Sequence, residues 1–151
     1  MDLIEKIKAS LENGRTEQQR GFESAKWKGI LYPELSWQIV GAAIEVHKHI
    51  GPGQLESVYQ RSMLCELRRR EIAVRAQVPV PMFFKGDRVG DFYADLIVED
   101  SIILELKAVE RLHAVHTAQL LSYLSAAGLR LGLLMNFNVP RMVQGVKRVV
   151  R

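Results

Sequence analysis

Four segments of the chain repeat their apolar residues with the spacing of a helix. The first, from Asp2 to Asn13, is short, and its apolar stripe consists of Leu3, Ile4, Ile7 and Leu11. Longer helices are expected at residues 33–50, about 54–70 and about 115–127. The sequence Gly51-Pro52-Gly53 separates the second helix from the third, because glycine and proline interrupt a helix.

Five further segments are dense in β-branched and apolar residues and are bounded by turn residues. Strands are therefore expected at residues 74–82, 89–98, 102–108, 129–137 and 145–150. The order after the first helix is two helices, three strands, a helix and two strands. Residues 1–33 are interpreted as an N-terminal helical arm and residues 34–151 as one compact domain. A helix as short as that of the arm is marginal in water, so we expect it to dock on the domain or on a second subunit, the latter giving a homodimer.

Composition narrows the class of protein. A chain of 151 residues with 48% hydrophobic and 25% charged residues suits a single globular domain. No apolar run approaches the roughly 20 residues of a membrane-spanning helix, and the charged N-terminus does not resemble a signal peptide. Cys65 is the single cysteine, which excludes an internal disulfide and a thiolate metal cluster and favours a reducing, cytoplasmic setting. The net charge of +4 favours phosphate-bearing partners, although many basic proteins of this size bind no nucleic acid.

The segment DFYADLIVEDSIILELKAVE, residues 91–110, carries the most informative chemistry. Two β-rich stretches flank residues 99–101, which suit a three-residue hairpin turn. A turn centred on the middle residue places Asp95 directly opposite Glu105, with their β-carbons about 5 Å apart on one face of the sheet. Lys107 lies two residues beyond Glu105, so the strand period places it on the same face. The opposite face of this second strand is expected in the core.

Two carboxylates this close repel each other unless a cation lies between them. Oxygen ligands at this spacing suit Mg²⁺ or Mn²⁺, and the ammonium of Lys107 could hold a water molecule and stabilise a negatively charged transition state. These groups together suit metal-assisted hydrolysis of a phosphodiester. The alternative is a solvent-facing ladder of charges, since Glu-x-Lys occurs by chance in most proteins. Against that alternative, the strand around Glu105 is otherwise apolar, and a buried carboxylate is costly unless it is paired or bound to a metal.

The helix that follows carries His116, Gln119 and Tyr123 at spacings that place them on one face. Its positively polarised N-terminal end favours phosphate and should lie near the carboxylates. A polar stripe at the boundary of the core, with Tyr123 half-buried, is the commoner explanation of such a pattern. Elsewhere, Phe83 and Phe84 could stack on bases, although adjacent phenylalanines more often belong to a core.

Three further features have ordinary explanations. Glu45, inside an apolar helix, could support the site, but a structural pairing with a nearby base is the commoner case. The basic run 68–70 could follow a phosphate backbone or could be a solvated helix end. His113 and His116 lie one turn apart without a third histidine or a cysteine, so no zinc site is expected.

Taken together, these residues resemble the PD-(D/E)XK nuclease superfamily. The order Asp95, Glu105-Leu106-Lys107, Gln119 and Tyr123 is similar to the Asp…Glu-x-Lys…Gln-x-x-x-Tyr order of its RecB-like and Cas4-like branch. A closer resemblance is to the GxxExxY proteins, whose signature here reads Gly53-Gln54-Leu55-Glu56-Ser57-Val58-Tyr59. The segments IVGAAIEVHKHIGPG, AQLLSYL and LGLLMNF also resemble that family. The resemblance covers about residues 34 to 150 and leaves out the arm.

The resemblance implies an α/β, restriction-endonuclease-like fold, in which helices flank a mixed β-sheet. It implies that Asp95 and Glu105 bind the metal and that Lys107 assists the attacking water. Glu56 matches the position of a further acidic ligand in many relatives, and the backbone carbonyl of Leu106 is another expected ligand. Four more residues would support the site or contact DNA: Gln119, Tyr123, Tyr59 and His116. Ala94 replaces the proline of the superfamily's name, a position that varies widely among relatives.

The expected activity is hydrolysis of DNA phosphodiester bonds with Mg²⁺ or Mn²⁺. One alternative is a nucleic-acid-binding or assembly subunit that retains the nuclease fold without turnover. Another is an enzyme that uses the same carboxylates on a different phosphate substrate.

Overall fold

The computed structural model describes residues 3–12 and 29–151. The helices of this part are α1 (Leu3–Glu12), α3 (Pro33–Ile50), α4 (Glu56–Arg69) and α5 (Ala114–Ala127), and a short 3₁₀ helix, η2, spans Met142–Gly145. The strands are β1 (Val74–Phe84), β2 (Asp87–Val98), β3 (Ile102–Lys107), β4 (Leu131–Asn136) and β5 (Val146–Val150). The predicted order of helices and strands is confirmed, and η2 is an element that the sequence pattern did not predict.

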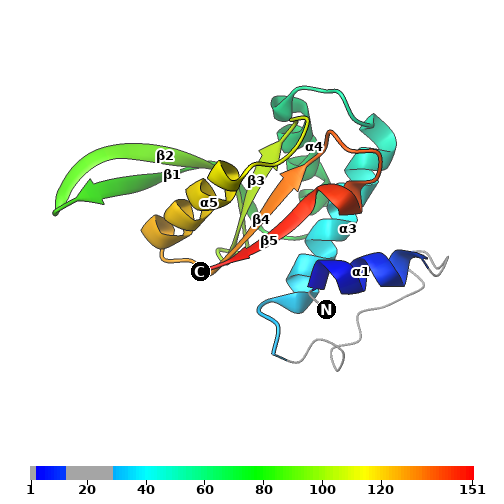
Figure 1. Cartoon of the computed structure of the whole chain (residues 1–151), viewed down its shortest axis with the longest axis horizontal. Helices are drawn as coiled ribbons and strands as arrows, with labels where there is room; N and C mark the ends of the chain where they lie inside the picture. Colours follow the sequence, from blue (N-terminus) through cyan, green and yellow to red (C-terminus); the bar gives the residue numbers. More distant parts are fainter. Residues whose placement is uncertain (1–2, 13–28) are drawn as a thin grey trace.

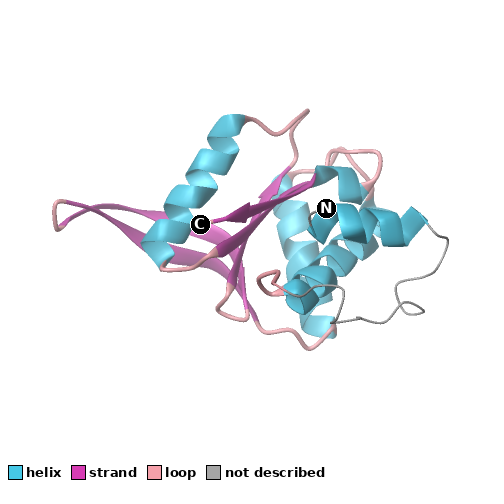
Figure 2. Ribbon diagram, turned by 60° about the horizontal axis from the view of Figure 1, so that its bottom comes forward, coloured by secondary structure: helices cyan, strands magenta, loops and turns pink. Residues whose placement is uncertain are grey.

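The strands form one mixed sheet in the order β1-β2-β3-β4-β5. The neighbours β1, β2 and β3 are antiparallel, β3 and β4 are parallel, and β5 is antiparallel to β4. A parallel pair needs a crossover connection, which here contains α5 (Figure 1). Helices cover both faces of the sheet, with α5 on one face and α1, α3 and α4 on the other (Figure 2). The predicted α/β architecture, a mixed sheet flanked by helices, is confirmed.

The sheet separates two apolar cores. On one face, Ile102, Leu104 and Leu106 of β3 share a core with α1, α3 and α4. On the other face, Leu120 of α5 packs over β4, where a β-carbon on Gly132 would lie 2.8 Å from the Leu120 side chain. Glycine at this position therefore lets α5 approach the sheet closely. Both central strands are buried on both faces, which explains their nearly continuous apolar sequences.

The N-terminal helix α1 packs on β5 and joins the larger core (Figure 1). Ile4 and Ile7 are buried there, so the described part of the predicted apolar stripe docks on the body of the protein. The side chains of Leu3 and Leu11, and the remainder of the arm at 13–28, lie outside the described residues. The boundary at residue 33 and the homodimer stay predictions.

The β1–β2 hairpin projects beyond α5 into solvent (Figures 1 and 2). Its turn contains Lys85 and Gly86, both with positive φ, and the register shifts between Met82 and Phe83. Phe83 and Phe84 are 61% and 62% exposed. The interpretation of this pair as core residues is therefore wrong, because the end of the hairpin extends past the helices that cover the rest of the sheet.

Candidate active site

The turn between β2 and β3 determines which residues meet at the candidate site. Leu96 pairs with Leu104, which is the register expected for a turn over residues 99–101. Continuing this register by one residue brings Asp95 opposite Glu105. The backbone pairing of the two strands ends at Leu96 and Leu104, and at this point the strands are joined by bonds that involve the carboxylate side chains. The sequence-derived register therefore agrees with the structure where the chemistry depends on it.

Each of the two carboxylates binds a backbone N–H group on the neighbouring strand. The N–H of Asp95 donates to Oε1 of Glu105 at 3.3 Å, and the N–H of Leu106 donates to Oδ2 of Asp95 at 2.8 Å. The two carboxyl groups also lie close enough for the charge of Asp95 to act on Glu105. These crossed bonds hold both carboxyl groups in a defined position between β2 and β3.

Burial shapes the electrostatics of the pair. Glu105 is only 7% exposed, so it is not part of a solvent-facing charge ladder. Burial raises the pKa of Glu105 to about 8, and the charge of Asp95 adds to the rise. Burial also raises the pKa of Asp95, against the opposing effects of the Leu106 N–H and the Lys107 charge. A cation bound to both carboxylates would offset the cost of ionising them in this buried setting.

The donor set fits a hard divalent cation. Two carboxylates come from adjacent strands, and the Leu106 carbonyl lies in the same stretch of β3. Within residues 3–12 and 29–151, no three acidic, histidine or cysteine side chains gather into a closed set of ligands. Mg²⁺ commonly takes one or two protein carboxylates and keeps water or substrate oxygens, whereas structural zinc takes four nitrogen or sulfur ligands. The residues present therefore suit Mg²⁺ or Mn²⁺ better than zinc.

Glu56 and Lys107 lie near the carboxylate pair. Glu56 is the first residue of α4, and its negative charge contributes to the raised pKa of Asp95. Lys107 is the half-buried last residue of β3, and its positive charge acts to lower the pKa of both carboxyl groups. The structure therefore brings a third acid and one ammonium group within electrostatic range of Asp95 and Glu105.

The first turn of α5 borders the same site. Burial lowers the pKa of His116, and the charge of Lys107 adds to this effect. Nδ1 of His116 accepts a hydrogen bond from the His113 N–H at 3.1 Å, so the neutral imidazole carries its proton on Nε2. Gln119, one turn further on, is exposed.

Tyr123 completes this face of α5. It is half-buried, and its ring stacks on Phe92 of β2 with centroids 3.6 Å apart and an angle of 10° between the planes. Burial raises the pKa of Tyr123, and the charges of Glu105 and Asp95 raise it further. Tyr123 is therefore both a packing residue at the core boundary and a neighbour of the carboxylates.

Tyr59 of the GxxExxY signature is a buried structural residue. Its hydroxyl donates to the Gly51 carbonyl at 2.6 Å and accepts from the Gln54 N–H at 3.1 Å. Its ring stacks on Phe137 with centroids 4.5 Å apart. With no exposed surface, Tyr59 can support the site by fixing the loop before α4, but it cannot contact DNA.

The sequence pattern did not single out Asn136, although it lies beside Lys107 in the β3–β4 register. Its buried amide accepts hydrogen bonds from the N–H groups of Val109 at 3.1 Å and Asn138 at 3.2 Å, and donates to the Val109 carbonyl at 2.9 Å. These bonds hold the loop that leaves Lys107. Gly145 is required next to it, because a β-carbon there would lie 1.9 Å from the Asn136 carbonyl oxygen. In the sequence, the one sign of this role is that Asn136, a polar residue, ends the otherwise apolar segment LGLLMN.

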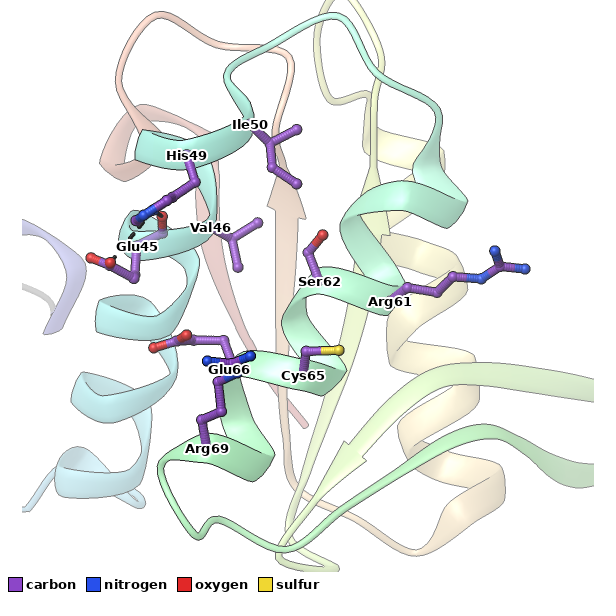
Figure 3. A pocket seen from close by; sticks show the side chains of 9 residues that line it. All are labelled: Glu45, Val46, His49, Ile50, Arg61, Ser62, Cys65, Glu66 and Arg69. Atoms are coloured by element: carbon purple, nitrogen blue, oxygen red, sulfur yellow. Dashed lines mark hydrogen bonds and ion pairs between the residues drawn. The ribbon is translucent and has the colours of Figure 1, made fainter.

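A cleft of about 440 Å³ lies elsewhere, between α3 and α4 (Figure 3). None of the carboxylate-site residues lines it. Glu45 on its rim pairs with His49 at 3.4 Å, which confirms the expected structural pairing of this acid with a nearby base. The cleft is thus separate from the carboxylate pair.

The fold and the carboxylate pair together define a nuclease-like α/β protein. A sequence profile of the PD-(D/E)XK nuclease superfamily matches residues 33–149, so the chain belongs to that superfamily. The mixed sheet flanked by helices is its restriction-endonuclease-like fold. Superfamily membership implies nucleic-acid binding, and these nucleases generally use divalent metals. No curated protein and no solved structure matches the chain. None of the described helices is long and apolar enough to cross a membrane.

Proposed function

We propose that the protein is a divalent-metal-dependent nuclease that hydrolyses phosphodiester bonds of DNA, of the GxxExxY type in the RecB-like and Cas4-like branch. The observation that carries this proposal is the pair formed by the half-buried Asp95 and the buried Glu105, within electrostatic range of Lys107. Such a pair is costly to ionise without a cation, and the neighbouring ammonium supplies the third group of the Asp…Glu-x-Lys pattern. The net charge of +4 is compatible with a polyanionic substrate.

In this proposal, Asp95, Glu105 and the Leu106 carbonyl would hold Mg²⁺ or Mn²⁺, and Glu56, which does not gather with the two acids into a set of three ligands, acts on the site through its charge. An ion bound there would supply positive charge for the scissile phosphate and would lower the pKa of an attacking water. Lys107 donates a hydrogen bond that orients this water, and it stabilises the negative charge that develops in the transition state. The buried position of Glu105 keeps competing water away and strengthens these interactions.

The residues of α5 and the buried Tyr59 have supporting parts in the proposal. The hydroxyl of Tyr123 is protonated at neutral pH, so it can donate a hydrogen bond to a phosphate oxygen. Nε2 of His116 is a second donor, because Nδ1 caps the helix. Gln119 is exposed and available to DNA, whereas Tyr59 acts by holding the loop before α4.

Cleavage of single-stranded, double-stranded and branched DNA with Mg²⁺ or Mn²⁺ tests the function. Lys107→Ala should lower the cleavage rate by roughly 10²–10³-fold while DNA binding stays nearly intact, because one ammonium acts mainly on transition-state charge. Asp95→Asn should also lose cleavage, but through metal affinity, so excess Mn²⁺ should restore part of it. Lys48→Ala, which changes an exposed lysine of α3, is the matched control.

Two results would overturn the proposal in different ways. A wild-type protein that binds DNA but never cuts it would be a binding or assembly subunit with the nuclease fold. A protein that neither binds nor cuts any of these DNAs would act on a different substrate.

A further inference from the structure

The projecting β1–β2 hairpin carries an unusual concentration of exposed apolar side chains. We define residues 79–93 as the hairpin arm. Its Phe83, Phe84, Val89 and Tyr93 are between 57% and 65% exposed. Exposed aromatic residues that cluster on a protruding element mark a binding surface more often than isolated ones do. The exposure of three aromatic rings on one projecting hairpin therefore calls for a physical explanation.

The hairpin arm, residues 79–93, begins at the candidate active site. Tyr93 lies two residues before Asp95 on β2, about 7 Å away along the strand. Its neighbours Phe92 and Ala94 pack toward α5, so Tyr93 faces the opposite side of the hairpin. Pro79 is the register partner of Tyr93 and shares its face. The exposed surface is therefore continuous with the strand that supplies a catalytic carboxylate.

The same face continues toward the tip of the arm. Phe83 lies four residues beyond Pro79 on β1, an even spacing that keeps it on the side of Tyr93. Arg88 is the register partner of Phe83, so the two side chains leave the hairpin on the same side. On the adjacent turn, the Lys85 ammonium lies 5.5 Å from the centre of the Phe84 ring. The row of rings thus has cations close to its outer end.

The charges of the arm do not suit the backbone of a duplex. Lys85 and Arg88 are balanced by Asp87 and Asp91, and Arg88 is bound to Asp91 at 3.1 Å through Nε. A duplex-binding wing depends on a clear excess of positive charge. Unpaired bases, in contrast, stack on aromatic rings whatever their sequence, an attraction that the paired bases of a duplex cannot offer.

The outer edge of the arm does not suit a partner β-strand. Pro79 and Pro81 both pair with β2, and neither has an N–H group to donate to an added strand. These prolines protect the edge of the sheet against extension. An occupant must therefore bind through the exposed rings.

We propose that the hairpin arm is a stacking platform for unpaired nucleotides. Tyr93 and Phe83 hold single-stranded DNA on the side of the hairpin turned away from α5, and the strand that carries Tyr93 continues to Asp95. This inference rests on the proposed nuclease function and specifies its substrate as DNA with a single-stranded segment.

Fluorescence anisotropy with a labelled oligothymidine and a blunt duplex of equal length tests the platform, first in EDTA so that no cleavage occurs. Tyr93→Ala and Phe83→Ala should each weaken single-strand binding roughly tenfold, and duplex binding should not change. Tyr93→Phe should retain binding because it keeps the ring, whereas Tyr93→Leu should lose it despite its apolar surface. Val150→Ala, an exposed change on β5, is the control. Thermal unfolding confirms that each variant folds.

The outcomes separate this inference from the nuclease proposal. If wild type cuts DNA and the Tyr93→Ala/Phe83→Ala variant binds and cuts single strands equally well, the platform is refuted and the nuclease stands. If wild type binds single strands through these rings but cuts nothing with Mg²⁺ or Mn²⁺, the nuclease is refuted and the platform stands. Retained binding by Tyr93→Leu, equal weakening of duplex binding, or no single-strand binding by wild type each overturns the platform.

Discussion

Replacing Glu105 with glutamine removes the charge of the buried carboxyl group and preserves its shape. The glutamine carbonyl can still accept the hydrogen bond from the Asp95 N–H, and its amide can donate to the Asp95 carboxylate. The substitution therefore isolates the cost of ionising Glu105 between β2 and β3. In a protein without metal, that cost should appear as a pH-dependent loss of stability.

The sign and the pH window follow from the pKa of Glu105, which rises from an ordinary 4.5 to about 8 in the folded protein. Between these values the folded state binds more protons than the unfolded state, so stability falls as pH rises. Above pH 8 the full difference for Glu105, whose pKa rises from 4.5 to about 8, amounts to about 4–5 kcal/mol. Glu105→Gln should therefore match wild type near pH 5 and exceed it near pH 9.

Thermal unfolding in EDTA from pH 5 to pH 9 measures this effect. At the alkaline end the variant should unfold roughly 10–20 °C above wild type. Saturating Mg²⁺ or Mn²⁺ should then stabilise wild type, by about 2.7 kcal/mol at a hundredfold excess over Kd, and should stabilise the variant much less. Glu110→Gln, which changes an exposed carboxylate on the loop after β3, should follow wild type throughout. Parallel pH curves for wild type and Glu105→Gln would refute the reasoning.

Three stability predictions follow from packing and hydrogen bonding. Gly145→Ala should lower the free energy of unfolding by more than about 3 kcal/mol, because the new β-carbon meets the Asn136 carbonyl. Gly90→Ala, with open space around it, should lower it by less than about 1 kcal/mol, and urea unfolding compares the two variants. Asn136→Ala should lose about 2–4 kcal/mol and increase amide hydrogen exchange at Val109, and unchanged exchange would contradict its part in holding that loop. Ile7→Ala should lower the free energy of unfolding by about 2–4 kcal/mol, and an unchanged value would show that α1 does not contribute to the core.

The hairpin geometry was predictable because local rules determine it. A turn over residues 99–101 sets the β2–β3 register, and the register decides that Asp95 meets Glu105. The burial of Glu105 was also predictable, since the apolar residues around it are typical of a strand covered on both faces.

Other features depend on contacts between distant segments, so the sequence pattern could not reveal them. Nothing in residues 74–93 distinguishes a hairpin that projects from one that packs, and this is why Phe83 could be interpreted as a core residue. The hydrogen bonds of Asn136 join β4 to a loop 27 residues earlier in the chain. Tyr59 belongs to a motif associated with function, but its part in this protein becomes clear only from its burial and its bonds to the loop before α4.

The most direct test of the proposed metal centre is a crystal soaked in Mn²⁺ and measured for anomalous scattering. The proposal predicts a peak between Asp95 and Glu105, about 2.0–2.3 Å from an oxygen of each carboxylate, with the Leu106 carbonyl as a further ligand. The crossed hydrogen bonds to the Asp95 and Leu106 N–H groups should persist, since they hold the carboxylates in place. A peak confined to another acidic group, or no peak at a concentration of Mn²⁺ that supports cleavage, would contradict the assignment of Asp95 and Glu105 as the metal ligands.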